Sequence, residues 1–425
     1  MLQVLNSAWA LLLGMMLLMV GNGLQGTLLG VRGEIEGFST LQMSVVMSAY
    51  FAGFLVSSRM TPELIRRVGH IRVFAALGSL VSATLITFPV LTDPISWTLG
   101  RVVIGFCFCG LYVTAESWLN NATTTENRGK ALSMYMIVQM SGVVAAQGLL
   151  VLGDPSGYIL FVIPSILVSL AFTPILLSVS PTPPFDSTKP MSLKELYRTS
   201  PLGCVGMFLL GGVFSAQFGM AAVFATQIGL SVGEISTFIA TIYVGALVLQ
   251  FPIGFVSDRI DRRILILACA AIGGAAALYY FLFGGSFYTL LVVGFIVGGT
   301  SNPLYALLLA YTNDYIEYED MPAASGGLLF INGVGAIAGP LITGYVMGAL
   351  GPNGFFLFIA SLMLGLAAYA MFRMTQRAPA FADDDYEATT YAPILPTASP
   401  VALEVAQEVY IETDQEIAEE VGASG

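Results

Sequence analysis

Long apolar runs separated by short polar stretches recur along the whole chain. Each run contains about 20 mainly apolar residues, the length at which an α-helix crosses a hydrocarbon core about 30 Å thick. The pattern therefore predicts an all-α membrane protein. We expect twelve transmembrane helices, at residues 7–30, 39–59, 71–91, 95–118, 130–152 and 157–179 in the first half, and at 202–226, 234–257, 263–283, 286–311, 322–347 and 353–374 in the second.

Two polar stretches divide the chain into four parts. Residues 180–201 are rich in Pro and Ser and separate an N-terminal six-helix bundle, residues 1–179, from a C-terminal six-helix bundle, residues 202–374. We expect residues 180–201 to form a cytoplasmic linker. Residues 375–425 form an acidic tail almost free of Lys and Arg, which predicts a largely disordered cytoplasmic extension. A short acidic amphipathic helix over Val401–Val421 is an alternative for part of this tail.

The two halves repeat each other at an offset of 192 to 193 residues. Residues of the same type coincide at this offset, in the pairs Gly53 and Gly245, Gln25 and Gln217, Tyr112 and Tyr305, Asn120 and Asn313, and Gly142 and Gly335. Shared glycine spacing alone is expected of any two packed helix bundles. Matched Gln, Tyr and Asn residues are not packing requirements, so we interpret the repeat as a duplicated six-helix unit with a cavity between its two copies.

Composition narrows the possible functions. The chain has 56% hydrophobic and 10% charged residues, which excludes an ordinary soluble domain. The formal net charge of -11 arises mainly from the tail and gives no reason to expect nucleic-acid binding. The four cysteines all lie in apolar runs, where small hydrophobic packing is their expected role. We expect no metal and no cofactor.

Basic residues gather at one end of the predicted helices. Lys and Arg near the ends of membrane helices are retained on the cytoplasmic side. If the N-terminus is cytoplasmic, every Lys and Arg except Arg32 and Arg101 lies on that side. The sequence therefore predicts a multi-pass protein of a bacterial inner membrane with both termini in the cytoplasm.

A glycine, an acid and a basic run follow the eighth predicted helix. This segment resembles the signature that carriers of the major facilitator superfamily place between the second and third helices of each half. The resemblance implies a cytoplasmic gate in which the glycine permits close helix contact and the acid pairs with neighbouring arginines. The gate residues that we expect in the second half are Gly254, Asp258, Arg259, Arg262 and Arg263.

The corresponding loop of the first half departs from this signature. It keeps the basic residues Arg66 and Arg67, but Arg66 stands where the superfamily usually has the acid. A gate network in this half must find its carboxylate elsewhere. The candidate is Glu116, near the inner end of the fourth predicted helix, which could pair with Arg66 or Arg67.

Further segments resemble the same superfamily. Arg101 and Gly105 are similar to an arginine motif of the fourth helix that is associated there with proton coupling, and Gly335, Gly339 and Pro340 are similar to a hinge motif. The segments 116–120 and 128–135 look like the YcaD-type branch of bacterial major facilitator carriers. The resemblance implies the major facilitator fold, with twelve transmembrane helices in two pseudo-symmetric six-helix bundles.

Ionisable and polar residues inside the predicted helices are the candidate cargo and coupling residues. A charge within a membrane helix is costly and by default indicates function, so we assign proton coupling or charge recognition to Arg101 and Glu116. Arg101 could instead snorkel to the nearby surface, and Glu116 suits a structural gate ion pair equally well. Uncharged polar residues near mid-span are expected to line the substrate cavity, although such residues also hydrogen-bond between helices; they are Asn22, Gln25, Tyr112, Gln139, Gln217, Asn302, Tyr305 and Asn332.

These features predict a secondary transporter that moves a small solute by alternating access. The scarcity of mid-span charge favours a neutral or weakly charged solute, although one arginine could orient a carboxylate. Proton-linked uptake, proton-linked efflux and uniport all remain open, and we expect a monomer in the lipid bilayer. The alternative is a non-transporting receptor or scaffold of the same fold. A membrane enzyme is disfavoured because no catalytic triad is visible and His70, the only histidine, falls in a cytoplasmic loop.

Overall fold

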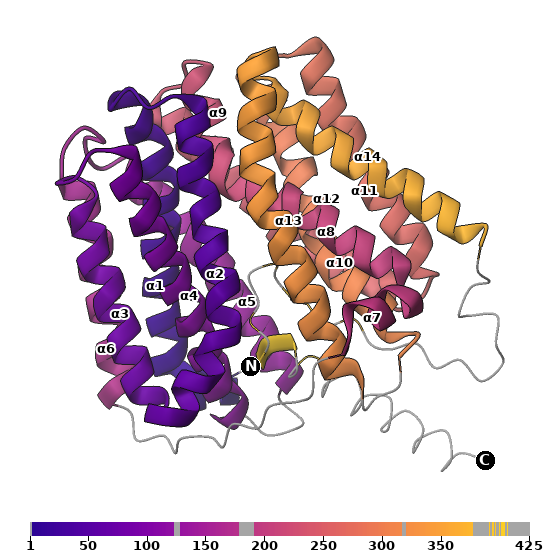
Figure 1. The fold of residues 1–425 in the computed structure, drawn as a ribbon, viewed down its shortest axis with the longest axis horizontal. Helices are drawn as coiled ribbons and strands as arrows, with labels where there is room; N and C mark the ends of the chain where they lie inside the picture. Colours follow the sequence, from indigo (N-terminus) through magenta and orange to yellow (C-terminus); the bar gives the residue numbers. More distant parts are fainter. Residues whose placement is uncertain are drawn as a thin grey trace.

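Two helical bundles lie side by side in the computed structural model (Figure 1). The structure describes residues 2–122, 128–177, 191–316 and 320–376, together with residues 391, 393, 394, 396, 399, 401–403 and 406 of the tail. The first bundle contains α1 (Leu2–Ile35), α2 (Thr40–Val68), α3 (His70–Thr87), α4 (Pro94–Ala122), α5 (Arg128–Leu150) and α6 (Ile159–Leu177). The second contains α8 (Pro201–Ser215), the π-helical turn η2 (Ala216–Met220), α9 (Ala221–Gln227), α10 (Val232–Ser257), α11 (Arg262–Phe283), α12 (Phe287–Asn313), α13 (Met321–Leu350) and α14 (Gly354–Met374).

The observed helices confirm the predicted all-α membrane fold. Among the described residues, 11 helices are long and apolar enough to cross a membrane. The one remaining predicted span, at 157–179, corresponds to α6, whose apolar part is shorter. The span predicted at 202–226 is one membrane crossing interrupted by η2, a type of turn that often marks a functional position. Within the predicted linker, Leu193–Thr199 forms the short helix α7 beside the second bundle.

Several helices are longer than predicted, because hydropathy detects only the part of a helix that lies in lipid. Helix α2 was expected to end at Arg59 but continues through Pro62 to Val68. Its last two turns carry polar and charged residues, which water can solvate beyond the hydrocarbon core. Gly69 then turns the chain into α3 with a φ of 86°, a left-handed conformation that favours glycine.

Burial follows the predicted repeat. The first and fourth spans of each half, which are α1, α4, α8–α9 and α12, are 83%, 83%, 83% and 78% buried. The other spans long enough to cross a membrane are 39% to 56% buried. Four helices at equivalent positions therefore form the interior of the protein, and the remaining helices separate them from lipid.

The repeat extends to helix caps and crossings. Ser39 of α2 and Ser231 of α10 both begin their helices with a capping box, in which the serine side chain accepts a backbone N–H three residues on. A Cβ on Gly53 would lie 2.0 Å from the carbonyl oxygen of Val102, and a Cβ on Gly245 would lie 2.3 Å from that of Phe295. Glycine therefore sets the backbone contact between the second and fourth spans in both halves.

The bundles are in direct contact towards both sides of the membrane. We call the side on which α1 begins the inner side and the opposite side the outer side. On the outer side, Gln227 Nε2 donates to Thr40 Oγ1 at 2.7 Å, and a Cβ on Gly30 would lie 2.6 Å from Ala222. Towards the inner side, α2 and α13 remain in contact through Arg59, whose guanidinium carbon lies 4.2 Å from the ring centroid of Phe330.

Candidate transport cavity and gates

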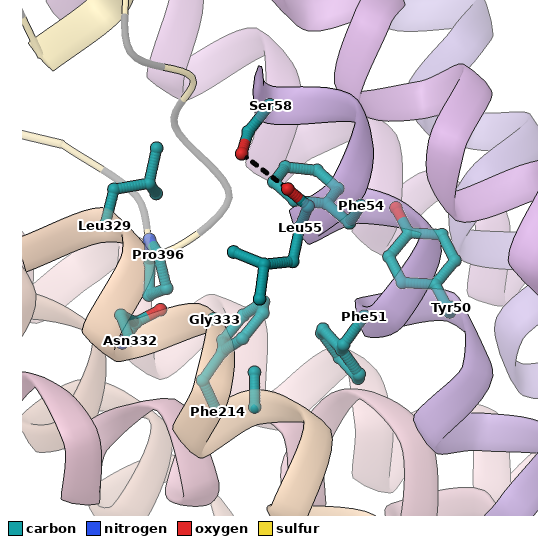
Figure 2. A pocket seen from close by; sticks show the side chains of 11 residues that line it. Tyr50, Phe51, Phe54, Leu55, Ser58, Phe214, Leu329, Asn332, Gly333 and Pro396 are labelled. Atoms are coloured by element: carbon teal, nitrogen blue, oxygen red, sulfur yellow. Dashed lines mark hydrogen bonds between the residues drawn. The ribbon is translucent and has the colours of Figure 1, made fainter. Parts of the chain in front are cut away.

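Two adjoining cavities lie between the bundles. The first is bounded by α2, α8 and α13 and encloses about 420 Å³ including open solvent; the second is bounded by α1, α4, α5, η2 and α10 and encloses about 360 Å³ on the same basis. Phe214 of α8 and Pro396 of the tail line both cavities. Figure 2 shows Pro396 beside Leu329 and Asn332 of α13. The predicted cavity between the halves is therefore present, and part of it is occupied by the chain's own tail.

A chain of hydrogen bonds connects polar residues within the first bundle. Asn22 donates from Nδ2 to the hydroxyl of Tyr112 at 3.0 Å and to that of Tyr50 at 3.4 Å. Gln25 donates from Nε2 to Asn22 Oδ1 at 3.2 Å. Because Asn22 and Tyr112 also line the second cavity, this network connects the cavity surface with the interior of the bundle.

Arg101 lies at the buried end of this network. Its Nη1 donates to Gln25 Oε1 at 3.0 Å, and its guanidinium carbon lies 4.6 Å from the ring centroid of Tyr50. Its side chain is fully buried, so it does not snorkel to the surface. Nε and Nη2 of this arginine have no partner among the described residues. A buried cation with two unpartnered donor nitrogens can bind an anionic group.

The polar residues of the second bundle bond mainly within that bundle. Gln217 donates to Ser301 Oγ at 2.9 Å, Asn302 donates to the carbonyl of Gly298 at 3.1 Å, and Asn332 donates to the carbonyl of Met207 at 3.0 Å. Tyr305 is buried, and its hydroxyl has no partner among the described residues. Among the described residues of this bundle, the polar interior thus has no counterpart of Arg101.

Four of the eight predicted cavity residues line the two cavities. Asn22, Tyr112 and Gln139 face the second cavity and Asn332 faces the first. Gln139 and Asn332 are repeat mates and lie in opposite bundles. Gln25, Gln217, Asn302 and Tyr305 are buried but are not among the lining residues of either cavity.

Sequence reasoning missed the aromatic part of the lining. The aromatic residues that line the two cavities are Tyr50, Phe51, Phe54, Phe214, Phe218 and Tyr243. Several recur four residues apart, as in Tyr50 and Phe54 or Phe214 and Phe218, and this spacing places them on one helix face. The spacing is visible in the sequence, but aromatic residues also face lipid and helix cores, so it does not single out a cavity.

The expected pairing of Glu116 with Arg66 or Arg67 is wrong. Both arginines pair with Glu63 of their own helix, at 2.7 and 2.6 Å, and their side chains are 71% exposed. Glu116 is buried and accepts hydrogen bonds from the hydroxyl of Tyr135 at 3.1 Å and from the backbone N–H and hydroxyl of Ser399. The prediction failed because Glu63, three and four residues before the arginines, reaches them on one helix surface.

The basic motif of the second half forms a partly buried charge network. Arg262 forms an ion pair with Asp314 at the inner end of α12, and its Nη2 lies 3.9 Å from Asp258. Arg263 pairs with Asp261 at 2.6 Å. Burial raises the pKa of the Asp258 carboxyl from its ordinary value. The ion pairs join the inner ends of α10, α11 and α12; the resemblance implied a pairing of Asp258 with neighbouring arginines but not the contribution of Asp314.

Two members of the same motif make other contacts. Arg259 is exposed, donates to the carbonyl of Phe255 at 2.7 Å and lies over the ring of that residue. Gly254 packs against Tyr391 of the tail, whose ring would lie 2.5 Å from a Cβ at this position. The close contact permitted by Gly254 is therefore with the tail.

The predicted hinge residues form a tight helix crossing. A Cβ on Gly335 would lie 2.0 Å from the carbonyl oxygen of Phe208, and one on Gly339 would lie 2.1 Å from Ser215 Oγ. Pro340 follows within the interior of α13. These residues hold α13 against α8 beside the cavity, and their action as a hinge remains a prediction.

The described part of the tail departs from the expected disordered extension. Pro396 and Ser399 are buried against both bundles, and Val401–Leu403 is helical and buried. Figure 1 shows this short helical piece, in yellow, near the first bundle. The acidic composition of the tail predicted disorder because net charge takes no account of the apolar residues that alternate with the acidic ones. The rest of the alternative helix at Val401–Val421, apart from Ala406, lies outside the described residues.

Two pseudo-symmetric helical bundles around a partly polar cavity form the architecture of a membrane transporter. The chain matches the Major Facilitator Superfamily over residues 11–231 and again over residues 202–403, and it belongs to this superfamily. It is 28% identical to the Uncharacterized MFS-type transporter YcaD of Escherichia coli (strain UMN026) over 359 residues, which are 83% of this chain and 92% of YcaD.

Solved structures share the fold at low sequence identity. The D323A mutant of the nucleoside transporter NupG has a TM-score of 0.74 at 16% identity, covering 86% of this chain and 99% of NupG. A bacterial homologue of the human lysosomal transporter Spinster, in an inward-facing and unoccupied conformation, has a TM-score of 0.67 at 13% identity, covering 96% of this chain and 98% of the homologue.

Proposed function

We propose that the protein is a secondary transporter that moves a small polar solute through the central cavity by alternating access. The observation that carries this proposal is the cavity itself, which both bundles line and which contains the paired amides Gln139 and Asn332. Apart from these two amides, few polar side chains line the two cavities, whereas many aromatic side chains do. Amides and aromatic rings bind neutral solutes that combine hydrogen-bonding groups with an apolar face.

The hydrogen-bond network of the first bundle supports a role for Arg101 in charge recognition or coupling. Its guanidinium is connected to the cavity surface through Gln25 and Asn22, so a change at the cavity can alter its environment. Protons or a carboxylate of the solute are the two candidate partners. Glu116 is a less direct coupling candidate, because it bonds to Tyr135 and to the tail at the inner edge of the protein.

The position in the membrane remains as the sequence predicts. We propose a bacterial inner-membrane location with the inner side facing the cytoplasm. The basic residues Arg66, Arg67 and Arg259 are exposed on the inner side, as positive-inside retention requires. The direct contacts on the outer side support closure of the cavity on that side.

Solute counterflow in proteoliposomes tests this function. Purified full-length protein is reconstituted and presented with labelled nucleosides, neutral hexoses and small monocarboxylates. We expect saturable counterflow of at least one solute class, with Tyr112→Phe lowering the rate about tenfold because the substitution removes one hydrogen-bonding group of the cavity network. Tyr158→Phe removes an exposed tyrosine hydroxyl and serves as the matched control. Equal rates in protein-free liposomes and in proteoliposomes for all three classes would refute the proposal.

A further inference from the structure

The tail returns into the protein after α14. Eight of its described residues are at least nine-tenths buried, namely Tyr391, Ile394, Pro396, Ser399, Val401, Ala402, Leu403 and Ala406. A tail that extended into water would expose such apolar side chains to the solvent. Their burial indicates that this part of the tail has a defined binding site on the two bundles.

Tyr391 attaches the tail to the second bundle. Its backbone N–H donates to Asp258 Oδ1 at 2.8 Å, and its hydroxyl accepts from Gln250 Nε2 at 2.6 Å. Its ring lies over Gly254, where a Cβ would come within 2.5 Å. The backbone, hydroxyl and ring of one residue therefore each have a partner on α10 and the residue that follows it.

Ser399 attaches the tail to the first bundle. Its backbone N–H donates to Glu116 Oε2 at 3.2 Å, and its hydroxyl donates to the same oxygen. The carboxylate also accepts from Tyr135 of α5. A buried carboxylate requires hydrogen-bond donors, and the tail supplies two of those observed at Glu116. Tyr391 and Ser399 consequently attach the tail to α10 and to α4, respectively, at the inner side.

Pro396 lies between these two attachments and lines both cavities. Figure 2 shows its ring approaching Leu329 and Asn332, in the space that a cargo in contact with Asn332 would need. A tethered segment acts at a high effective concentration, on the order of millimolar for a short flexible link. A cargo that reaches the cavity from the inner side must therefore displace it.

We propose that the described tail residues between Tyr391 and Ala406 form an internal plug that competes with the cargo and keeps the inner side from closing. This inference rests on the proposed transport function and adds a regulatory element to the same cavity. The bridge between α4 and α10 must break before the inner ends of the bundles can approach each other. Release of the tail thus precedes transport.

Thiol labelling of the full-length chain tests whether the plug covers the cavity. Ser58 lines the first cavity together with Pro396 and is buried, so Ser58→Cys reports access to this space. The protein is held in lipid nanodiscs, its native cysteines are replaced, and N-ethylmaleimide modification is followed by mass. The release variant combines Tyr391→Ala with Ser399→Ala, and the matched control combines Tyr158→Ala with Ser156→Ala in an exposed outer loop.

The release variant should label about tenfold faster than its parent, because several tail contacts are lost, whereas the control should not change. Counterflow of the same solutes should increase in parallel. Equal labelling of parent and release variant would overturn the plug, and so would equal counterflow in an active transporter. Faster labelling of a protein that transports no tested solute would leave the tail contact supported and would contradict the proposed function.

Discussion

The two bundles share a backbone plan but differ in where they place charge. In both halves a glycine brings the second span against the fourth, and the first and fourth spans are the most buried. The first half has Arg101 deep in its interior and only an exposed ion cluster at its inner loop. Among its described residues, the second half has no charge in its polar interior and a buried ion pair, Arg262 with Asp314, at its inner end. Duplication thus preserved the packing while the two copies diverged in chemistry.

This difference suggests a division of tasks. A buried guanidinium with unused donors suits recognition or coupling, and the half that contains it also contains the hydrogen-bond network to the cavity. A buried ion pair between helix ends suits the fixed part of a gate. We therefore expect substitutions in the first half to affect transport more than stability, and substitutions in the charge network of the second half to do the reverse.

The largest effect on stability should come from Arg262→Ala. The substitution leaves the Asp314 carboxylate, 4% exposed, without the guanidinium that faces it, and we expect the free energy of unfolding to fall by about 3–5 kcal/mol. Arg66→Ala is the matched control in the first half and should change stability by less than about 1 kcal/mol, because its ion pair is solvated. SDS-induced unfolding in mixed micelles measures both. Equal losses in the two variants would remove the distinction between the two inner loops.

A smaller effect, equal in both halves, is expected at the glycine crossings. Gly53→Ala and Gly245→Ala would each place a Cβ against a backbone carbonyl oxygen and should each destabilise by about 1–3 kcal/mol. Gly365→Ala is the control, because a Cβ there has no atom within 4 Å and alanine favours a helix. The same unfolding assay applies. A loss of stability in only one of the two variants would show that the two crossings are not equivalent. The similarity of the two halves would then be limited to their sequence pattern.

The sequence could predict the positions of the spans and the repeat but not the partners of the charged residues. Hydropathy locates helices because lipid selects apolar residues over a fixed length, and repeat mates such as Gly53 and Gly245 identify themselves by residue type. The link between Arg101 and Gln25 joins residues 76 positions apart, so neither helix alone indicates it. Glu116 was assigned to the wrong partner, because its donor Ser399 lies 283 residues away in a segment whose composition suggested disorder.

The central claim is that the two halves move against each other around the cavity. Distances measured between the two bundles test this claim most directly. Spin labels at Arg72 and Lys194 report the inner side, and labels at Glu34 and Tyr288 report the outer side; all four residues are exposed. Labels at Glu34 and Tyr158 lie within the first bundle and serve as a fixed reference. In lipid nanodiscs, across the solute classes and from about pH 5 to pH 8, we predict that the inner distance shortens whenever the outer distance lengthens, while the reference stays constant. A single unchanged distance for both inter-bundle pairs under every condition would contradict the account.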